Sequence, residues 1–368
     1  MLPPQKISER LRETQKFYEP KPPTLLIRLW HVINGSALAA VMILFASLSR
    51  LVASFTSADR NTESDPLSSC FISGFFFVSF PTYHLSTARK DYVRVSESLI
   101  IAAEALEKEA RPEHMLKMMK VTRLSRKLIA AYLGEAVSAV TMIIAMWIHS
   151  NASPMPFLGK ESVYYQLVCC AELVVVIPMG MFAVVSFAMF HLEVTLCMTC
   201  MYDILGKLLR MVSTRERVHE LIRIHQLLLN ASKIFRDVFS AQWFGLLFNL
   251  ITIMIIATFT VIALSFEVNL SLLTVICLSF LFGACISGEM ITVSSESIGF
   301  AVYQNDWINT MSELRGDMSL VIMRSQKTVG ITAGVLGNLN LVQLGSVLKN
   351  WYRYVQALLK LRRNLSFR

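Results

Sequence analysis

Six polar or small residues recur at steps of three and four along the last apolar stretch of the sequence, Leu341–Leu361. They are Gln343, Ser346, Asn350, Arg353, Ala357 and Lys360, here called the polar stripe. This spacing places them on one face of a helix, while apolar side chains cover most of the remaining surface. A charge at bilayer depth costs about 3 kcal/mol or more, so Arg353 and Lys360 must face protein or water. The polar stripe therefore predicts either a helix that lines a water-filled path between subunits or a helix packed against polar neighbours within one subunit.

Residues that could form a catalytic or metal site are scattered. No two of the seven histidines form a metal-ligand pair on one helix. Cys197 and Cys200 form a lone CxxC pair without a second pair or a nearby histidine cluster, so apolar packing is their expected role. The sequence also lacks the GxSxG and HExxH motifs and a phosphate-binding glycine loop. We therefore expect no enzyme activity, metal site or cofactor.

The composition is typical of an all-α protein that crosses a membrane several times. Hydrophobic residues make up 54% of the 368 residues and charged residues 17%, and the mean hydropathy is +0.52. Six apolar runs approach the length of about 20 residues that a helix needs to cross a bilayer. They are Leu29–Ser49, Leu67–Leu85, Leu128–Ile148, Leu167–Met189, Trp243–Leu264 and Leu270–Met290. The amphipathic stretch Leu341–Leu361 makes seven predicted spans.

Lysine and arginine predict the orientation, because they concentrate on the cytoplasmic side of membrane proteins. The N-terminal segment and the second, fourth and sixth loops hold 26 of them, against three in the odd-numbered loops. This difference predicts an inverted topology, with the N-terminus inside and the C-terminus outside. The basic C-terminal tail opposes the rule but is too short to reverse the count. The net charge of +9 thus reflects topology, and we expect no nucleic-acid partner.

The cytoplasmic loops have helical patterns, which predict helices that extend below the membrane and pack as a bundle. Leu221, Ile224, Leu228, Ala231 and Ile234 repeat at helical spacing in the fourth loop. In the sixth loop an apolar stripe across Ile308–Ser325 precedes the helix breakers Gly330, Gly334 and Gly337. We therefore divide the chain into a cytoplasmic segment (1–28), six spans with helical extensions (29–290), a cytoplasmic anchor helix and linker (291–335), and a final span with an outer tail (336–368).

Aromatic and methionine side chains gather in the predicted outer halves of the spans. Together they would form an adaptable apolar pocket for a small volatile, although aromatic belts or core packing would explain many of them equally well. The acid Glu172 lies inside the fourth span, where an ionisable residue indicates either a functional site or a structural hydrogen bond. The candidate pocket comprises Phe71, Phe75, Phe76, Met142, Met146, Trp147, Tyr164, Tyr165, Glu172 and Phe280.

The C-terminal third of the sequence resembles the signature of insect odorant receptors. Four short motifs occur in the family's order and spacing: Ala301, Tyr303, Asp306 and Trp307; Arg324 to Lys327; Thr332 to Gly334; and Leu348 and Lys349 ahead of Tyr352 and Tyr354. A further match covers Ile224, His225, Leu228 and Leu229, followed by Asp237, Phe239 and Ser240. One departure is Thr328, where the family commonly has proline.

The resemblance implies an odorant-gated, non-selective cation channel in the plasma membrane of olfactory sensory neurons. It implies a tuning subunit that forms a heterotetramer with a longer shared co-receptor and binds a small volatile among its outer spans. The family's narrow gate would fall near Ala357, Lys360 and Leu361, with Arg353 on the same pore-facing side. The subunit contacts of the anchor would involve Tyr303, Asp306, Trp307, Arg324 and Gln326.

Two other receptor types remain alternatives. A gustatory-type ligand-gated channel subunit has a similar architecture, but it typically ends in a Thr-Tyr pair with a later Gln-Phe, where this chain has Arg353-Tyr354 and Lys360-Leu361. A G-protein-coupled receptor also has seven spans, but its N-terminus is outside, and this chain lacks an NPxxY-like turn in its last span.

Overall fold

The computed structural model describes residues 6–19, 89–150, 177–263, 268–305 and 314–366, and within them the regular structure is helical apart from one isolated β-bridge. The all-α prediction is confirmed for this part of the chain. The predicted spans Leu29–Ser49 and Leu67–Leu85 lie outside it. The elements are α1 (Ile7–Tyr18), α5 (Arg89–Glu109), α6 (Pro112–Ser150), α8 (Ile177–Met211), α9 (Arg215–Ala263), α10 (Val268–Tyr303), α12 (Arg315–Ser325), the 3-10 turn η3 (Gly334–Leu336) and α13 (Leu341–Ser366).

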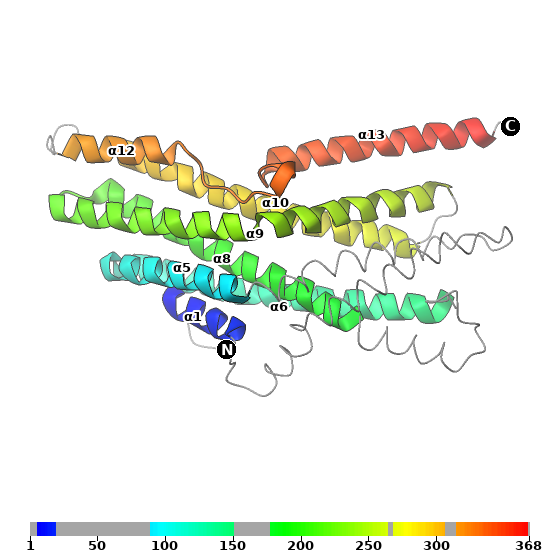
Figure 1. Cartoon of the computed structure of the whole chain (residues 1–368), viewed down its shortest axis with the longest axis horizontal. Helices are drawn as coiled ribbons and strands as arrows, with labels where there is room; N and C mark the ends of the chain where they lie inside the picture. Colours follow the sequence, from blue (N-terminus) through cyan, green and yellow to red (C-terminus); the bar gives the residue numbers. More distant parts are fainter. Residues whose placement is uncertain (1–5, 20–88, 151–176, 264–267, 306–313, 367–368) are drawn as a thin grey trace.

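Four helices are far longer than a bilayer requires, and they run side by side along the long axis of the molecule (Figure 1). The longest, α9, has 49 residues and is therefore roughly 73 Å long, against about 30 Å for the hydrocarbon core of a bilayer. Helices α6, α8 and α10 have 39, 35 and 36 residues. Such lengths fit the prediction that the spans continue as a helical bundle beyond the membrane.

Three described helices are long and apolar enough to cross a membrane: Val184–Met211, Arg215–Phe259 and Cys277–Tyr303. The best apolar window of the first is 83% buried inside the chain, against 33% for the third. Hydropathy alone therefore does not identify which helix surfaces face lipid. Much of the apolar surface of α8 packs against other helices of the bundle.

The apolar residues that repeat at helical spacing in the predicted fourth loop form part of the core. Leu221, Ile224, Leu228 and Ala231 on α9 are all buried, because steps of three and four place them on one face. A buried polar contact accompanies this packing, in which the hydroxyls of Tyr202 on α8 and Ser232 on α9 lie 3.0 Å apart.

The cysteine pair of α8 serves the same core. Cys197 and Cys200 are buried as free thiols in the hydrophobic cluster, where they pack as small apolar residues. Within the described residues no group of three or more His, Cys, Asp or Glu side chains is arranged to hold a metal ion.

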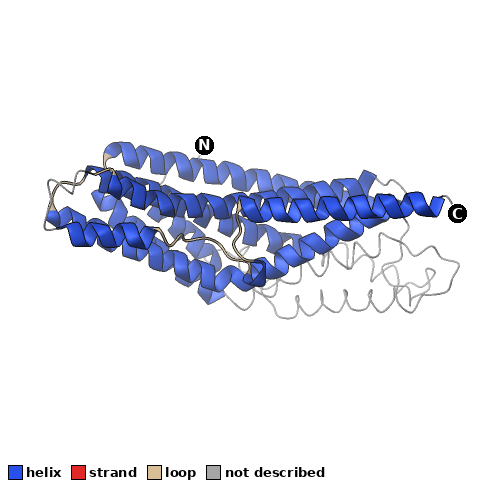
Figure 2. Ribbon diagram, turned by 90° about the horizontal axis from the view of Figure 1, so that it is seen from above, coloured by secondary structure: helices blue, strands red, loops and turns tan. Residues whose placement is uncertain are grey.

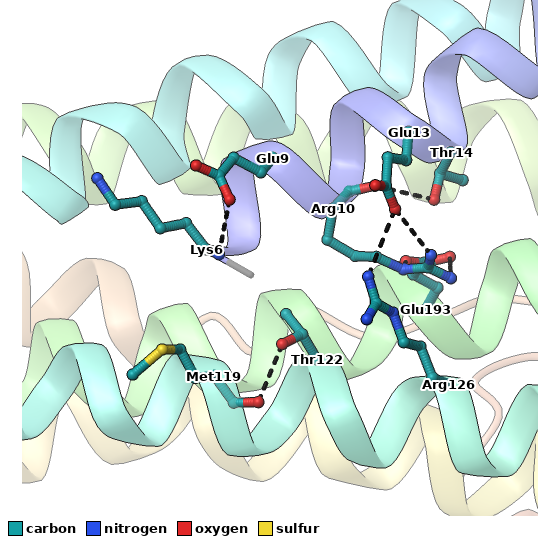
Figure 3. A network of polar contacts seen from close by, with 9 residues as sticks. All are labelled: Lys6, Glu9, Arg10, Glu13, Thr14, Met119, Thr122, Arg126 and Glu193. Carbon is teal, nitrogen blue, oxygen red and sulfur yellow. Dashed lines mark hydrogen bonds and ion pairs between the residues drawn. The ribbon is translucent and has the colours of Figure 1, made fainter. Parts of the chain in front are cut away.

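The N-terminal helix α1 is a feature that the sequence analysis did not predict. It packs against α5, α6 and α8 and buries Ile7, Leu11 and Tyr18 (Figure 1). Arg10 forms an ion pair with the buried carboxylate of Glu193 on α8, and Glu13 lies 3.6 Å from Arg126 on α6 (Figure 3). These contacts tie the first described segment to three helices of the bundle.

Tyr18 closes the end of α1 against the same bundle. Its ring stacks on Tyr92 of α5 and meets Phe190 of α8 edge to face. Burial, with a smaller contribution from Glu193, raises the pKa of the Tyr18 hydroxyl well above its usual range. The hydroxyl therefore stays neutral and donates a hydrogen bond to the Ser186 carbonyl oxygen, 3.0 Å away.

Candidate ion-conducting helix and its linker

The last helix, α13, presents different chemistry on two faces. Its apolar face packs against α9 and α10, with Leu344 buried and Val347, Leu348 and Trp351 partly buried against the core. Most of the rest of the helix is exposed, including the apolar side chains of Val342, Leu359 and Leu361. Of the polar stripe, Ser346, Asn350, Arg353, Ala357 and Lys360 are exposed, and Gln343 is half-buried.

The exposure of the polar stripe bears on the two predictions for it, as far as the described residues reach. In the described residues the polar stripe faces away from the subunit that carries it, so polar neighbours within that subunit do not account for it. If α13 crosses the membrane, as the sequence predicts, Arg353 and Lys360 would face water or another polypeptide chain, because a charge in lipid costs about 3 kcal/mol or more.

A specific hydrogen bond fixes the rotation of α13 about its own axis. The indole Nε1 of Trp351 donates to the hydroxyl of Thr258 on α9 over 3.1 Å, and that hydroxyl donates in turn to the Met254 carbonyl oxygen. Trp351 follows Leu344 by seven residues, which places both on one side of the helix. The apolar side is thus held to α9, and the polar stripe is directed outward.

The linker of residues 326–340 joins α12 to α13, as the predicted breakers required (Figure 2). Gly334 and Gly337 have φ values of 51° and 85°, a left-handed conformation that L-residues with a side chain rarely adopt. A bridge between Thr332 and Asn338 closes the turn around η3. The final predicted element is therefore two helices separated by an ordered turn. The expected boundary at 335/336 falls inside η3, and the last helix begins only at Leu341.

Helix α9 holds the turn of this linker through one hydroxyl. Ser240 accepts a hydrogen bond from the Thr332 hydroxyl at 3.0 Å and another from the backbone N–H of Gly334 at 3.1 Å. Gly334 also lies against Phe244, since a Cβ added there would be 3.2 Å from the Phe244 Cβ atom. Close approach and positive φ both favour glycine at this position.

Helix α10 holds the linker at two further points. The backbone N–H of Val329 donates to Ser295 Oγ over 3.1 Å. Leu339 passes so close to Gly288 that an added Cβ would lie 1.9 Å from the Leu339 carbonyl oxygen. The linker therefore lies directly on the backbone of α10.

The start of α13 is fixed to the same helix. Asn340 caps α13, because its Oδ1 accepts the N–H of Gln343 at 2.8 Å. Glu289 of α10 accepts the N–H of Leu341 at 3.2 Å. Both oxygens satisfy N–H groups that a helix N-terminus leaves without a partner inside the helix. A displacement of α10 near these residues would consequently be transmitted to α13.

Comparison with known proteins places the chain in a family. The sequence matches the 7tm odorant receptor family over residues 65–352, which is most of its length. The chain belongs to the odorant receptor family. A comparison with curated proteins finds no relative of similar sequence.

Solved structures of insect odorant receptors have a similar fold. The olfactory receptor OR5 of Machilis hrabei in complex with eugenol superposes with a TM-score of 0.74 at 12% sequence identity, covering 96% of this chain and 97% of that receptor. The same receptor in a second structure superposes with a TM-score of 0.73, at the same identity and coverage. At this identity the likeness shows the fold alone.

Two motifs of the odorant receptor signature, distant in sequence, meet at the linker. Ser240 closes the motif on α9, and Thr332 and Gly334 belong to the motif between α12 and α13, so the hydrogen bonds of Ser240 join them. The sequence motifs mark both segments but do not show that they bind one another.

The anchor candidates of this odorant receptor lie on its surface where they are described. Tyr303, Arg324 and Gln326 are exposed, and Arg324 donates to the Lys327 carbonyl oxygen at 3.2 Å. Asp306 and Trp307 lie outside the described residues. Exposed apolar side chains surround the same end of α10 and α12: Phe300, Leu320 and Met323.

The predicted odorant pocket lies mostly outside the described part of the chain. This holds for Phe71, Phe75, Phe76, Tyr164, Tyr165 and Glu172. Met142, Met146 and Trp147 belong to α6, but their side chains lie outside the described set. Phe280, on α10, is half-buried and packs against the hydrophobic core.

Proposed function

We propose that this chain is the odorant-binding subunit of a heteromeric, odorant-gated, non-selective cation channel. Its place would be the plasma membrane of olfactory sensory neurons, with the N-terminus inside. Membership of the odorant receptor family supports the receptor role. The fold, shared with a receptor solved with eugenol, supports a small volatile as the ligand. A longer co-receptor would complete a heterotetramer.

One observation carries the channel proposal, namely the outward orientation of the polar stripe. Helix α13 packs on α9 and α10 through residues such as Leu344 and Trp351, while Arg353, Ala357 and Lys360 remain exposed. In a ring of subunits such a face would enclose a water-filled path. The gate would then lie near Ala357, Lys360 and Leu361.

Assembly would use the exposed end of α10 and α12. Phe300, Leu320 and Met323 expose apolar surface beside Arg324 and Gln326. Protein interfaces commonly combine apolar side chains with polar ones. We expect subunit contacts at this surface, together with Tyr303, Asp306 and Trp307.

Gating would follow from a shift between two conformations of the bundle. An odorant in the outer pocket would favour the conformation that it binds more tightly, since only differential affinity shifts an equilibrium. Phe280 and Gly288 lie on the same helix, two turns apart. Movement of α10 at the pocket would therefore reach the linker at Leu339 and displace α13.

Co-expression tests the assignment as a tuning subunit. Cells that express the chain with the co-receptor should give inward currents to some members of a panel of volatiles, and cells that express it alone should give none. Currents from the chain alone would contradict the heteromer. An N-terminal tag should be labelled only after permeabilisation, and labelling of intact cells would favour a G-protein-coupled receptor.

Cysteine substitution tests the pore. Arg353→Cys, Ala357→Cys and Lys360→Cys channels should be modified by water-soluble thiol reagents, with a change in current. Leu358→Cys is the matched control, because Leu358 is half-buried on the other side of α13. If the cysteines at 353, 357 and 360 do not react, at rest and during odorant stimulation, the pore assignment is refuted. Equal modification of Leu358→Cys would contradict it as well.

A further inference from the structure

The charge of α13 is unusual for a helix proposed to line a cation channel. Residues 341–366 contain Lys349, Arg353, Lys360, Arg362 and Arg363 and no acidic residue. Helices that conduct cations commonly present acidic or neutral groups to the ions, because rings of basic side chains favour anions. The question is therefore what effect these basic residues have on the passage of cations.

Two of these charges belong to the exposed polar stripe. Arg353 and Lys360 are both exposed. Seven residues separate them, which is about two helical turns and roughly 10 Å along the axis. Ala357 lies between them, and its short side chain leaves space beside both charges.

Neither charge is needed to hold α13 in place. The helix is fixed by Leu344, by the hydrogen bond of Trp351 to Thr258, and by the cap at its start. All of these contacts lie on the apolar side or at the first turn. The charges of Arg353 and Lys360 are therefore free to act on ions in the water on the exposed side of α13.

We propose that Arg353 and Lys360 lower the permeability of the channel to divalent cations relative to monovalent cations. The proposal rests on the proposed function, since it requires α13 to line the pore. A fixed positive charge raises the energy of a divalent cation twice as much as that of a monovalent cation at the same distance. Calcium entry is then reduced more than sodium entry.

The size of the effect follows from the distance and the screening. For a charge about 6 Å from a permeating ion in a water-like medium, screened with a Debye length of about 8 Å, the ratio of divalent to monovalent entry changes by about 1.7-fold. If the subunit contributes one such helix among four, conduction of monovalent cations continues. The charges thus tune selectivity without blocking the pore.

The experiment compares the ratio of calcium to sodium permeability in channels formed with the co-receptor. It is measured from reversal potentials with calcium as the only external cation and then with sodium, during stimulation by the most effective volatile of a test panel. Arg353→Gln and Lys360→Gln should each raise the ratio about 1.7-fold, and the double variant should raise it further.

Arg362→Gln is the matched control. Arg362 is exposed and only two residues from Lys360, but two residues correspond to about 200° around a helix, so it lies on the opposite side. Its substitution removes the same charge at nearly the same height and should leave the ratio unchanged. An equal effect at Arg362 would mean that charge acts from outside the pore.

Chemical modification supplies a second test that does not depend on the glutamine variants. In Lys360→Cys channels a positively charged thiol reagent should restore the low ratio, and a negatively charged reagent should raise it. If the cysteine reacts with both reagents and the ratio does not move, the selectivity proposal is wrong while the pore assignment stands. If the cysteines at 353 and 360 do not react at all, both proposals fail together.

Discussion

Gly288 offers the sharpest test of how α10 is joined to the last helix. In the Gly288→Ala variant the new Cβ would lie 1.9 Å from the Leu339 carbonyl oxygen, while ordinary van der Waals contact begins at 3.4 Å. The backbone must therefore move by about 1.5 Å. Leu339 is buried, and its N–H donates to the Ile331 carbonyl oxygen at 2.8 Å, so the linker cannot move without losing contacts.

The expected cost follows from two opposing effects. Alanine is favoured over glycine within a helix by about 1 kcal/mol. Forcing additional atoms into a packed site costs about 1–3 kcal/mol, and occasionally more. Because the atom that Cβ meets belongs to the backbone, we expect the upper part of this range and a net loss of about 2 kcal/mol. This loss should lower the melting temperature by about 3 °C.

The assay is thermal stability of the detergent-solubilised receptor, followed by the fraction that survives heating as a single size-exclusion peak. Gly134→Ala is the matched control, because Gly134 lies inside α6 and an added Cβ there meets no atom within 4 Å. This control should equal or exceed the parent chain in stability. If Gly288→Ala is as stable as Gly134→Ala, the close contact between α10 and the linker does not exist.

Two further predictions concern contacts between distant segments. Ser240→Ala removes the acceptor of two hydrogen bonds, so it should destabilise the receptor by about 1–3 kcal/mol and weaken odorant responses. Ser297→Ala is the control, because it removes only an exposed local hydrogen bond on α10. It should have little effect on the melting temperature or on the dose response. Arg10→Met leaves the carboxylate of Glu193 buried without its cation, so the free energy of unfolding in the same melting assay should fall by about 3–5 kcal/mol. Adding Glu193→Gln should recover part of this loss. If the effects of the two substitutions simply add, the ion pair is contradicted.

The sequence predicted those features that depend on local pattern. Steps of three and four residues identified the buried face of α9 at Leu221 to Ala231 and the polar stripe of α13. The glycines after α12 predicted the break between the last two helices, since glycine readily adopts positive φ. The candidate pocket and the first two spans stay predictions, because they lie mostly outside the described residues.

The sequence analysis missed α1 because charged residues dominate its pattern. Apart from Ile7, Leu11 and Tyr18, most of its twelve residues are polar or charged, and so short a helix is marginal without tertiary contacts. Its stability depends on partners such as Glu193, 183 residues away from Arg10. A pattern within twelve residues carries no information about such a partner.

By itself the sequence determined that the chain is helical, which side of α13 is polar and where the chain must turn before it, because these properties follow from residue types a few positions apart. Only the tertiary structure decided that Ser240 binds the turn at Gly334 and that Gly288 receives the backbone of Leu339. The physical reason is that hydrogen bonds and close contacts between distant segments depend on how whole helices pack. That packing minimises the free energy of all segments together and leaves no periodic signal in any one of them.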